Sequence, residues 1–421
     1  VTDVTVNFSE PRKYGKLNHM FNLHSWAPFY ANVDNIMNMS GDYTWQMISL
    51  GACGLLQNRL ATAVGQFGYS AHKDPYEPEK WRHSAHAKLT YSGLYPVFEF
   101  SVDFNDRAAR QWSPYLYLQQ GGTGISLGSK AMDTPYIQGN ISMYIPFDFS
   151  SGGWFRGFIP KVSYKISNDM FRTDATVLDV QSVWTAADEG GLTESGRNDF
   201  YRVTGGQNTF RHSISGSVRG YTMLATPNSA IYPKWGIGVE AGGFYGLESS
   251  EYLSPMGYGY VYGYIPGIIP THGIKLTGMA QMKLNDAPFG QAAVNILPRG
   301  LSGNSELLNW LAVRNDMLMK ATVDYAFPIY IGDLALGGNL FSIKRLIINP
   351  HFDYFHTGEN ALYSAGAELI LDLNSILTLE VPCSFGVTYS YNGGDGMERL
   401  AKESSITIDH HFVGPTFNIT F

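Results

Sequence analysis

The sequence predicts an all-β fold, a transmembrane antiparallel β-barrel of about 16 strands. Charged residues make up 15% of the 421 residues, against roughly 25% in a soluble domain. Aromatic residues make up 14%, and there are 46 glycines. No uncharged apolar run approaches the roughly 18 residues that a spanning helix needs. A barrel accounts for these observations together, because only alternate residues of its strands touch lipid. The alternative is a soluble, tyrosine-rich β-sandwich or glycan-binding protein.

Period-two alternation locates the strands, because alternate side chains of a strand point to opposite faces of the sheet. Within 83–92, for example, Ala85, Ala87 and Leu89 alternate with polar residues. In a soluble sandwich the apolar face would be the core, whereas in a barrel it faces lipid and the polar face lines the interior. The predicted strands cover residues 44–56, 59–71, 83–92, 95–105, 137–147, 158–168, 173–184, 198–205, 209–221, 234–246, 271–283, 317–327, 341–355, 362–374, 380–391 and 404–421.

The connections between these strands are of two kinds. Short ones, such as Gln57-Asn58 and Ser92-Gly93, are typical of periplasmic turns. One long connection contains four tyrosines between residues 258 and 264, which we interpret as a packed loop or an interfacial aromatic belt. A sugar-stacking platform is the alternative. The long connections, typical of extracellular loops, cover residues 106–136, 185–197, 247–270 and 284–316.

The N-terminal segment 1–40 does not alternate and contains two prolines. We predict that it precedes the barrel or plugs its periplasmic mouth, and that the barrel domain covers 41–421. The sequence starts at Val1 without a visible signal peptide, which favours a mature or truncated start. Cys53 and Cys383 lie far apart in strand-like runs, so two buried or lipid-facing thiols are favoured over a disulfide.

The last predicted strand carries apolar side chains at Phe417, Ile419 and the terminal Phe421. A terminal aromatic on an alternating strand resembles the β-signal by which the outer-membrane assembly machinery recognises its clients. Such a strand must offer an unpaired edge to a templating partner before the barrel closes. The alternative is an aromatic residue that ends an ordinary strand by chance.

Three short motifs follow one another in the last third of the chain. Arg299 and Gly300 lie in a long connection, Asp324 precedes Phe327-Pro328-Ile329 in the next strand, and Asp353 lies in the strand after it. Over roughly residues 270–421, this order resembles the bacterial surface antigen superfamily, whose members include BamA, TamA and two-partner secretion transporters.

The resemblance implies that the loop with Arg299 and Gly300 folds back into the barrel interior. It also implies that Asp324 and Asp353 stand at the family's acidic positions. The match is imperfect, because Asp324 replaces the usual Glu, His351 replaces an aromatic residue and Phe355 replaces a Gly.

An arginine inserted in a barrel interior needs partners, because an unpaired charge in a partly dry interior is unfavourable. Asp324 lies on the polar face of its strand, and two carboxylates can accept the guanidinium fork. The alternative is that Arg299 lies in a solvated external loop and both Asp residues line a wet interior independently.

A second Arg-Gly sequence, within Ser217-Val218-Arg219-Gly220-Tyr221, is closer to the family's usual loop motif. We nevertheless choose Arg299, because Arg219 lies on an alternating strand. Position also favours Arg299, since the 122 residues after it leave room for the strands that the family places after its loop.

The opening segment 14–28 resembles the start of barrel domains in Bacteroidota envelope proteins, where the barrel often follows a TolB-like propeller. We therefore expect a non-enzymatic protein of the bacterial outer membrane. It would serve envelope biogenesis or protein translocation, or anchor a larger outer-membrane complex. A porin-like channel for small solutes is the second hypothesis, and an outer-membrane enzyme is a distant third.

No catalytic residue, metal or cofactor is predicted. The sequence contains no GxSxG, HExxH or P-loop motif. His351 and His356 have opposite parity on a strand, which argues against a joint metal site with Asp353. Segment 392–396 is interpreted as a hairpin turn rather than a calcium loop. The net charge of −7 argues against nucleic acid. The expected partners are outer-membrane lipid and lipopolysaccharide, and other outer-membrane or periplasmic proteins in a complex.

Overall fold

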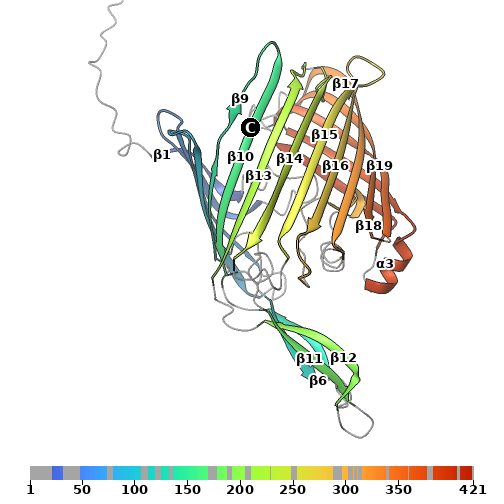
Figure 1. The fold of residues 1–421 in the computed structure, drawn as a ribbon. Helices are drawn as coiled ribbons and strands as arrows, with labels where there is room; N and C mark the ends of the chain where they lie inside the picture. The colour runs from blue at the N-terminus through green and yellow to red at the C-terminus, as the bar shows by residue number, and fades with distance from the viewer. Residues whose placement is uncertain are drawn as a thin grey trace, which may run out of the picture.

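A computed structural model gives one large antiparallel sheet and two small two-stranded sheets (Figure 1). No helix among the residues placed in it is long and apolar enough to cross a membrane. The structure describes residues 21–31, 48–73, 79–105, 112–118, 125–131, 135, 137–168, 178–186, 192–203, 210–227, 229–247, 254–287, 296–301, 307, 311, 315–337, 341–358, 360–376, 383–404 and 408–419.

The large sheet has 17 strands, of which the two-residue β9 (Phe147–Asp148) continues the line of β8 along β10. The other 16 strands (17 minus β9) pair in chain order, each with its two neighbours, except that β1 and β21 at the ends of the sheet have one neighbour each. They are β1 (Asn22–Ala31), β2 (Ile48–Gln57), β3 (Ala63–Lys73), β4 (Trp81–Tyr91), β5 (Val97–Phe104), β8 (Ile137–Tyr144), β10 (Trp154–Ser167), β13 (Arg211–Leu224), β14 (Gly236–Gly246), β15 (Met256–Pro266), β16 (Gly273–Lys283), β17 (Met317–Leu336), β18 (Phe341–Thr357), β19 (Asn360–Ile376), β20 (Cys383–Gly393) and β21 (His411–Ile419).

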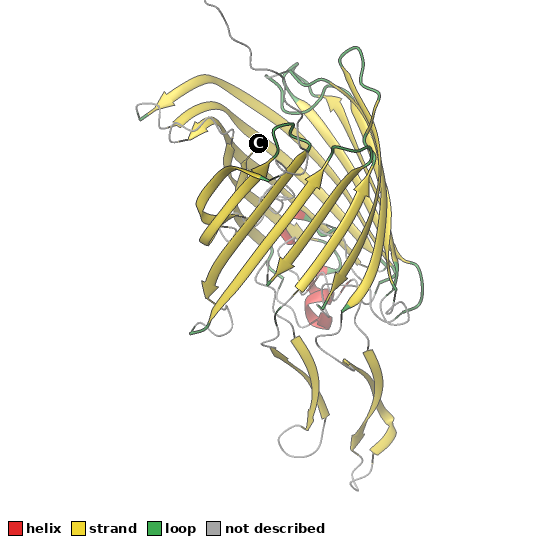
Figure 2. Cartoon of the chain, turned by 90° about the vertical axis from the view of Figure 1, so that its left-hand side faces the viewer, coloured by secondary structure: helices red, strands yellow, loops and turns green. Residues whose placement is uncertain are grey.

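Because neighbouring strands are antiparallel, their connections gather at two ends. We call the end with the short β2–β3 and β4–β5 connections the turn end, and the opposite end the loop end. The β16–β17 connection and helix α3 (Met397–Ser404) belong to the loop end. The two small sheets also project there, at the bottom of Figures 1 and 2. Their strands are β6 (Trp112–Leu118) with β7 (Ile125–Ala131) and β11 (Leu178–Ala186) with β12 (Leu192–Val203).

The two faces of the large sheet differ in polarity. On the outer face, Val323, Phe352 and Leu369 are 44%, 45% and 52% exposed, while Asp324 and Asp353 on the inner face are buried. A soluble sandwich would bury the apolar face and expose the polar one. Apolar residues outside and polar residues inside are typical of a barrel whose outer face meets lipid.

The first and last strands are the edges of this sheet. Within the described residues, β1 pairs only with β2 and β21 pairs only with β20. The barrel is therefore open between β1 and β21 in this structure. Of the predicted β-signal, Phe417 and Ile419 lie on β21 opposite Phe385 and Cys383, whereas Phe421 lies outside the described residues.

An apolar cluster lies in the interior near the loop end, against β17 to β19. It joins three parts of the chain: the β16–β17 connection, the inner faces of β17 to β19, and the segment with α3. The buried members of the cluster are Ile296, Leu297, Leu301, Leu307, Leu311, Leu318, Phe355, Leu362, Met397 and Leu400. The β16–β17 connection therefore folds inward, as the resemblance implies.

The sequence prediction of an antiparallel barrel of about 16 strands is confirmed, but two of the predicted members are wrong. Segments 173–184 and 198–205 fall on β11 and β12, which form their own two-stranded sheet instead of barrel strands. Two barrel strands, β1 and β15, were not predicted. The errors cancel in number, which is why the predicted count agrees with the structure.

The domain boundary predicted at 40/41 is wrong for β1, because residues 22–31 pair with β2 as part of the barrel. Register shifts between Leu23 and Ser25 and between Ala27 and Phe29 interrupt its alternation. Such bulges add a residue to one strand and reverse the parity of those that follow. The remaining residues of the predicted plug segment lie outside the described part of the chain, except Phe21.

The tyrosine-rich stretch is strand β15, so its interpretation as a loop or an interfacial belt is wrong. Tyr262 is buried, and it shares the inner face with Tyr258, Tyr260 and Tyr264, whereas Val261 is exposed on the outer face. The outward positions beside Val261 are mostly glycines. The strand therefore shows no apolar alternation, although its backbone pairs with β14 and β16.

Candidate functional site in the barrel interior

The candidate site is built around the inward-folded β16–β17 connection. Its Arg299–Leu301 segment forms a short 3-10 turn, η3. Ile296, Leu297 and Leu301 around this turn belong to the buried apolar cluster. The backbone of the turn is thus anchored on both sides of Arg299, which directs the guanidinium toward the inner faces of β17 to β19.

The Arg299 guanidinium contacts carboxylates from three neighbouring strands. Nη2 donates to Oδ1 of Asp324 on β17 at 2.7 Å and lies 3.3 Å from Oδ1 of Asp353 on β18. Nη1 donates to Oε1 of Glu368 on β19 at 3.0 Å. The backbone N–H of Arg299 donates to the second oxygen of Asp353 at 2.7 Å. One residue of the connection therefore joins three strands of the wall.

Strand pairing explains why these carboxylates converge. Asp324 is paired with His351, which lies two residues before Asp353 on the same face of β18. Glu368 is paired with Asn349 of β18, and the Asn349 amide donates to Glu368 Oε2 at 2.8 Å. Period two then places all three carboxylates on the inner face of the barrel.

Gly300 fits the site because its backbone lies against β19 and β20. Its N–H donates to Ser364 Oγ at 3.2 Å, and its carbonyl accepts from Asn392 Nδ2 at 3.2 Å. A Cβ at this position would clash with the Asn392 side-chain oxygen. The turn can therefore approach the wall this closely only with glycine at position 300.

A second cation, Lys320 of β17, supports the same turn. Its Nζ donates to the Leu297 carbonyl at 2.6 Å and lies 3.8 Å from Asp353 Oδ2. Burial by itself lowers the pKa of Arg299, but Asp324, Asp353 and Glu368 outweigh that effect and raise it. The guanidinium thus remains charged and bound to its acidic partners at any physiological pH.

A tyrosine ladder extends along the inner wall on the turn-end side of the site. Tyr232 lies in the connection between β13 and β14. Its ring centroid is 5.5 Å from that of Tyr264 in a tilted arrangement, and the Tyr264 ring is 5.8 Å from that of Tyr262, edge to face. Burial, followed by the charges of Asp324 and Glu368, raises the pKa of Tyr232. The arginine cluster and the tyrosine ladder are therefore electrostatically linked.

The same β13–β14 connection is also held by a hydrogen bond from β18. The Arg345 guanidinium on β18 donates to the Ala230 carbonyl at 3.0 Å and to Asp372 of β19 at 2.6 Å. Because β13 and β18 are separated by four strands, segment 229–235 must fold inward to reach Arg345. We call this segment the inner turn.

The structure places the four predicted interior residues in one cluster, since Arg299 contacts Asp324 and Asp353, and Gly300 packs beside them. Arg219 lies on β13, as expected for the rejected motif, and donates to the Tyr262 hydroxyl at 3.2 Å. The functional role of the cluster stays a prediction.

Sequence reasoning missed Glu368, Lys320, Ser364 and Asn392. Glu368 and Ser364 were detectable, because both lie on the polar face of the alternating segment 362–374. Asn392 was assigned to a hairpin turn, and nothing in the sequence indicates its contact with Gly300.

The histidines of β18 lie on opposite faces. His351 is buried on the inner face and contacts Ser390 Oγ at 3.0 Å through Nε2, whereas His356 lies on the outer face beside Met319. Within the described part of the chain, no group of three or more His, Cys, Asp or Glu residues is placed to hold a metal ion.

Comparisons with known proteins give similarity at the level of structure. No protein-family model matches the chain, and no curated protein sequence matches it. Among solved structures, CdiB from Escherichia coli is similar at 9% identity and a TM-score of 0.43, covering 89% of this chain and 60% of CdiB. BamA from Haemophilus ducreyi lacking POTRA domains 1–3 is similar at 10% identity and a TM-score of 0.40, covering 90% of this chain and 68% of that one. The chain thus spans about three fifths of the length of CdiB.

Proposed function

We propose that this chain is an outer-membrane barrel of the surface antigen type that serves envelope biogenesis or protein translocation, or anchors a larger outer-membrane complex. Its partners would be outer-membrane lipid and lipopolysaccharide, and other outer-membrane or periplasmic proteins. The proposal includes no catalytic activity, cofactor or metal.

The observation that carries the proposal is the attachment of Arg299 to Asp324, Asp353 and Glu368. A porin needs a water-filled passage, whereas here a loop folds into the interior and is held against β17 to β19 by ion pairs and a buried apolar cluster. Such a loop suits a barrel whose interior opens only when a partner or client protein rearranges the loop.

A porin-like channel is the second candidate, and one feature of the opposite wall favours it. Ser163, Ser215 and Ser217 lie beside Lys161 around an interior pocket of about 270 Å³. These small polar side chains on β10 and β13 would suit passage of hydrophilic solutes. The two candidates therefore differ in whether the locked connection blocks the path.

Planar-bilayer conductance of the purified chain distinguishes them. We expect no large steady openings from the wild type, and frequent openings from Arg299→Ala, because the loop loses its ionic attachment to three strands. Arg219→Ala is the matched control, since Arg219 also faces the interior but bonds to Tyr262 instead of the carboxylates. Large steady openings from the wild type would contradict the proposal and favour the porin.

Depletion of the protein from its host tests the biogenesis part. We expect the amounts of other outer-membrane barrels in isolated outer membranes to fall, as measured by quantitative mass spectrometry. Unchanged amounts would contradict a role in biogenesis and leave the anchoring role.

A further inference from the structure

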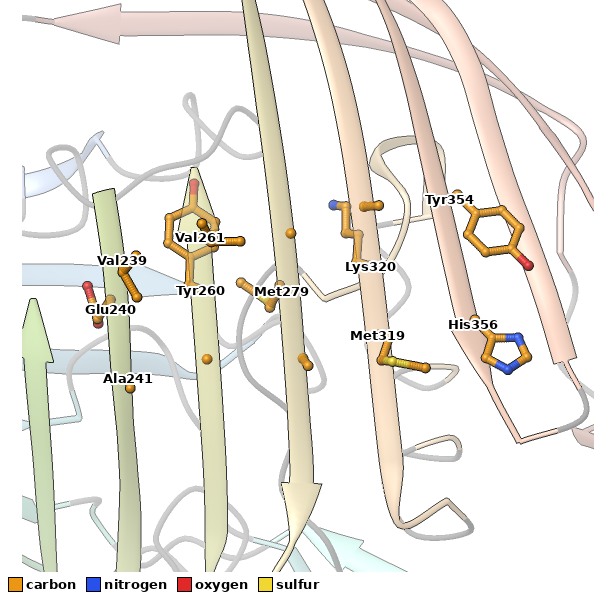
Figure 3. A pocket seen from close by; sticks show the side chains of 14 residues that line it. Val239, Glu240, Ala241, Tyr260, Val261, Met279, Met319, Lys320, Tyr354 and His356 are labelled. Atoms are coloured by element: carbon orange, nitrogen blue, oxygen red, sulfur yellow. The ribbon is translucent and has the colours of Figure 1, made fainter. Parts of the chain in front are cut away.

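A groove crosses the outer face of the barrel over β14 to β18 (Figure 3). Its volume is about 690 Å³, within the range of about 300–1,000 Å³ that is usual for ligand pockets. Strand pairing shows that two adjacent rows of outward residues form it. They are Ala241, Gly259, Ala280, Met319 and His356, and Val239, Val261, Gly278, Ala321 and Tyr354.

The groove exists because most residues in the middle of the two rows are small. Gly259, Gly278 and Ala280 have little or no side chain, whereas Leu276 and Val323 beside the groove project outward and are 42% and 44% exposed. The wall is therefore recessed between ordinary lipid-facing side chains. In a bilayer, whatever occupies this recess must itself be apolar along most of its length.

One end of the groove is polar. Both rows begin at Val239 and Ala241 on β14 and end at Tyr354 and His356 on β18. A ligand that lies along them would thus have an apolar part and a hydrogen-bonding part. Because His356 is next to the last residue of β18, this polar end lies close to the loop end of the barrel.

His356 differs from three other outward histidines near the loop end. Nδ1 of His83 is 2.6 Å from the Tyr69 hydroxyl, Nδ1 of His411 is 3.0 Å from the Tyr389 hydroxyl, and His212 makes the same contact with Tyr164. Nδ1 of His356 is buried and has no hydrogen-bond partner in the described structure. A buried polar atom without a partner is unfavourable. Because the His356 side chain as a whole is partly exposed, a turn of its ring can bring Nδ1 to the groove, where a ligand can supply the missing hydrogen bond.

We propose that the groove binds an outer-leaflet glycolipid of the lipid A type. One acyl chain lies over the small residues between β14 and β17, and the amide or hydroxyl group at the polar end of that chain donates to His356 Nδ1. The inference rests on the proposed outer-membrane location with the loop end outside, because that orientation places the polar end of the groove in the outer leaflet.

Native mass spectrometry of the full chain in detergent tests the proposal with purified lipid A as the probe. Dioleoyl phosphatidylcholine is the comparison, because it has acyl chains but no hydrogen-bond donor. We expect its retention to be about fivefold weaker, the equivalent of one lost hydrogen bond. Equal retention of both lipids, or none of lipid A, would overturn the proposal.

Two glycines of β15 provide matched variants. A Cβ on Gly259 meets nothing within 4 Å, so Gly259→Leu can fill the groove without disturbing the wall and should weaken lipid A retention about tenfold. Gly263 lies on the same outward face, outside the groove, and a Cβ there comes no closer than 3.7 Å to Gly236 O. Gly263→Leu should leave retention unchanged, and an equal loss in both variants would contradict the proposed site.

His356→Phe keeps the ring and removes its nitrogens. We expect it to weaken lipid A retention to the level of phosphatidylcholine and to leave phosphatidylcholine retention unchanged. An unaltered preference for lipid A would overturn the role of His356.

Dimers of the chain that disappear in Gly259→Leu would instead make the groove an interface between two copies and overturn the proposal. A porin-like conductance together with selective lipid A retention would refute the proposed function and support this site.

Discussion

At the scale of single residues, Arg299 and its acidic partners depend on one another. The Asp353 side chain is fully buried, and it accepts both from the Arg299 guanidinium and from the Arg299 backbone. Removing the arginine would leave three carboxylates close together without their main counter-charge. The effect of the substitution should therefore exceed the value of one hydrogen bond, because uncompensated buried charge is unfavourable in itself.

Arg299→Ala is expected to destabilise the barrel by about 3–5 kcal/mol, the usual effect of breaking a buried ion pair. The measurement is urea-induced unfolding in lipid vesicles. Asp353→Ala should have a smaller effect in the Arg299→Ala background than in the wild type, with a coupling of about 1–3 kcal/mol. Additive effects in this double-mutant cycle would show that the two side chains do not interact.

Gly300→Ala is expected to destabilise the barrel by about 1–3 kcal/mol, as overpacking usually does, because its Cβ clashes with the Asn392 side chain. Asn392→Gly should recover part of that loss by removing the obstructing amide. Gly220→Ala is the control, since a Cβ on Gly220 meets no atom closer than 4.0 Å. The measurement is the unfolding midpoint of each variant in the same vesicles. An equal loss of stability in Gly300→Ala and Gly220→Ala would contradict the predicted clash with Asn392.

The site could be predicted from the sequence only in part. Arg299, Asp324 and Asp353 could be identified because the order of the motifs resembles that of the surface antigen superfamily, and because both Asp residues lie on the polar faces of alternating strands. Glu368 and Asn392 were not identified, since their contacts depend on the register between strands and on how deeply the connection enters the barrel. Neither quantity is contained in local alternation, which fixes the face of a side chain and not its height along the wall.

At the scale of elements, β15 shows where period-two analysis fails. Period-two alternation is visible only when one face carries apolar residues, but in β15 most outward positions are glycines and most inward positions are tyrosines. β1 fails for a different reason, because its register shifts reverse the parity within ten residues. In both cases backbone pairing with neighbours, invisible in the sequence, determines the strand.

The inner turn should become accessible when its attachment is removed. Arg345→Ala deletes the hydrogen bond to the Ala230 carbonyl, so the segment that contains the exposed Lys234 should open more often. We expect trypsin to cleave after Lys234 at least about tenfold faster in this variant, as followed by peptide mass spectrometry. Arg219→Ala is the matched control and should leave the cleavage rate unchanged. If Arg345→Ala also left the cleavage rate unchanged, other contacts would hold the inner turn.

At the scale of the whole molecule, the topology assigns each connection to one end of the barrel. The proposed orientation places the loop end, with the β11–β12 sheet, outside the cell and the turn end in the periplasm. The two ends are thus expected to differ in access from the cell surface, although the same sheet forms both.

An epitope tag between β11 and β12 should bind antibody on intact cells. A tag between Gly152 and Gly153, in the exposed turn before β10, should bind only after permeabilisation, because that turn lies at the turn end. Flow cytometry of both strains gives the readout. Staining in the reverse pattern would invert the orientation and with it the leaflet assigned to the outer groove.

The meeting of three carboxylates on β17, β18 and β19 also constrains the order of assembly. Before the connection enters, Asp324, Asp353 and Glu368 would face one another with Lys320 as the nearest cation, and their mutual repulsion would oppose closure of that part of the wall. Arg299 turns this repulsion into attraction. We therefore expect β17, β18 and β19 to reach their final pairing only together with the loop, so a chain whose loop is excluded should pair these three strands more slowly.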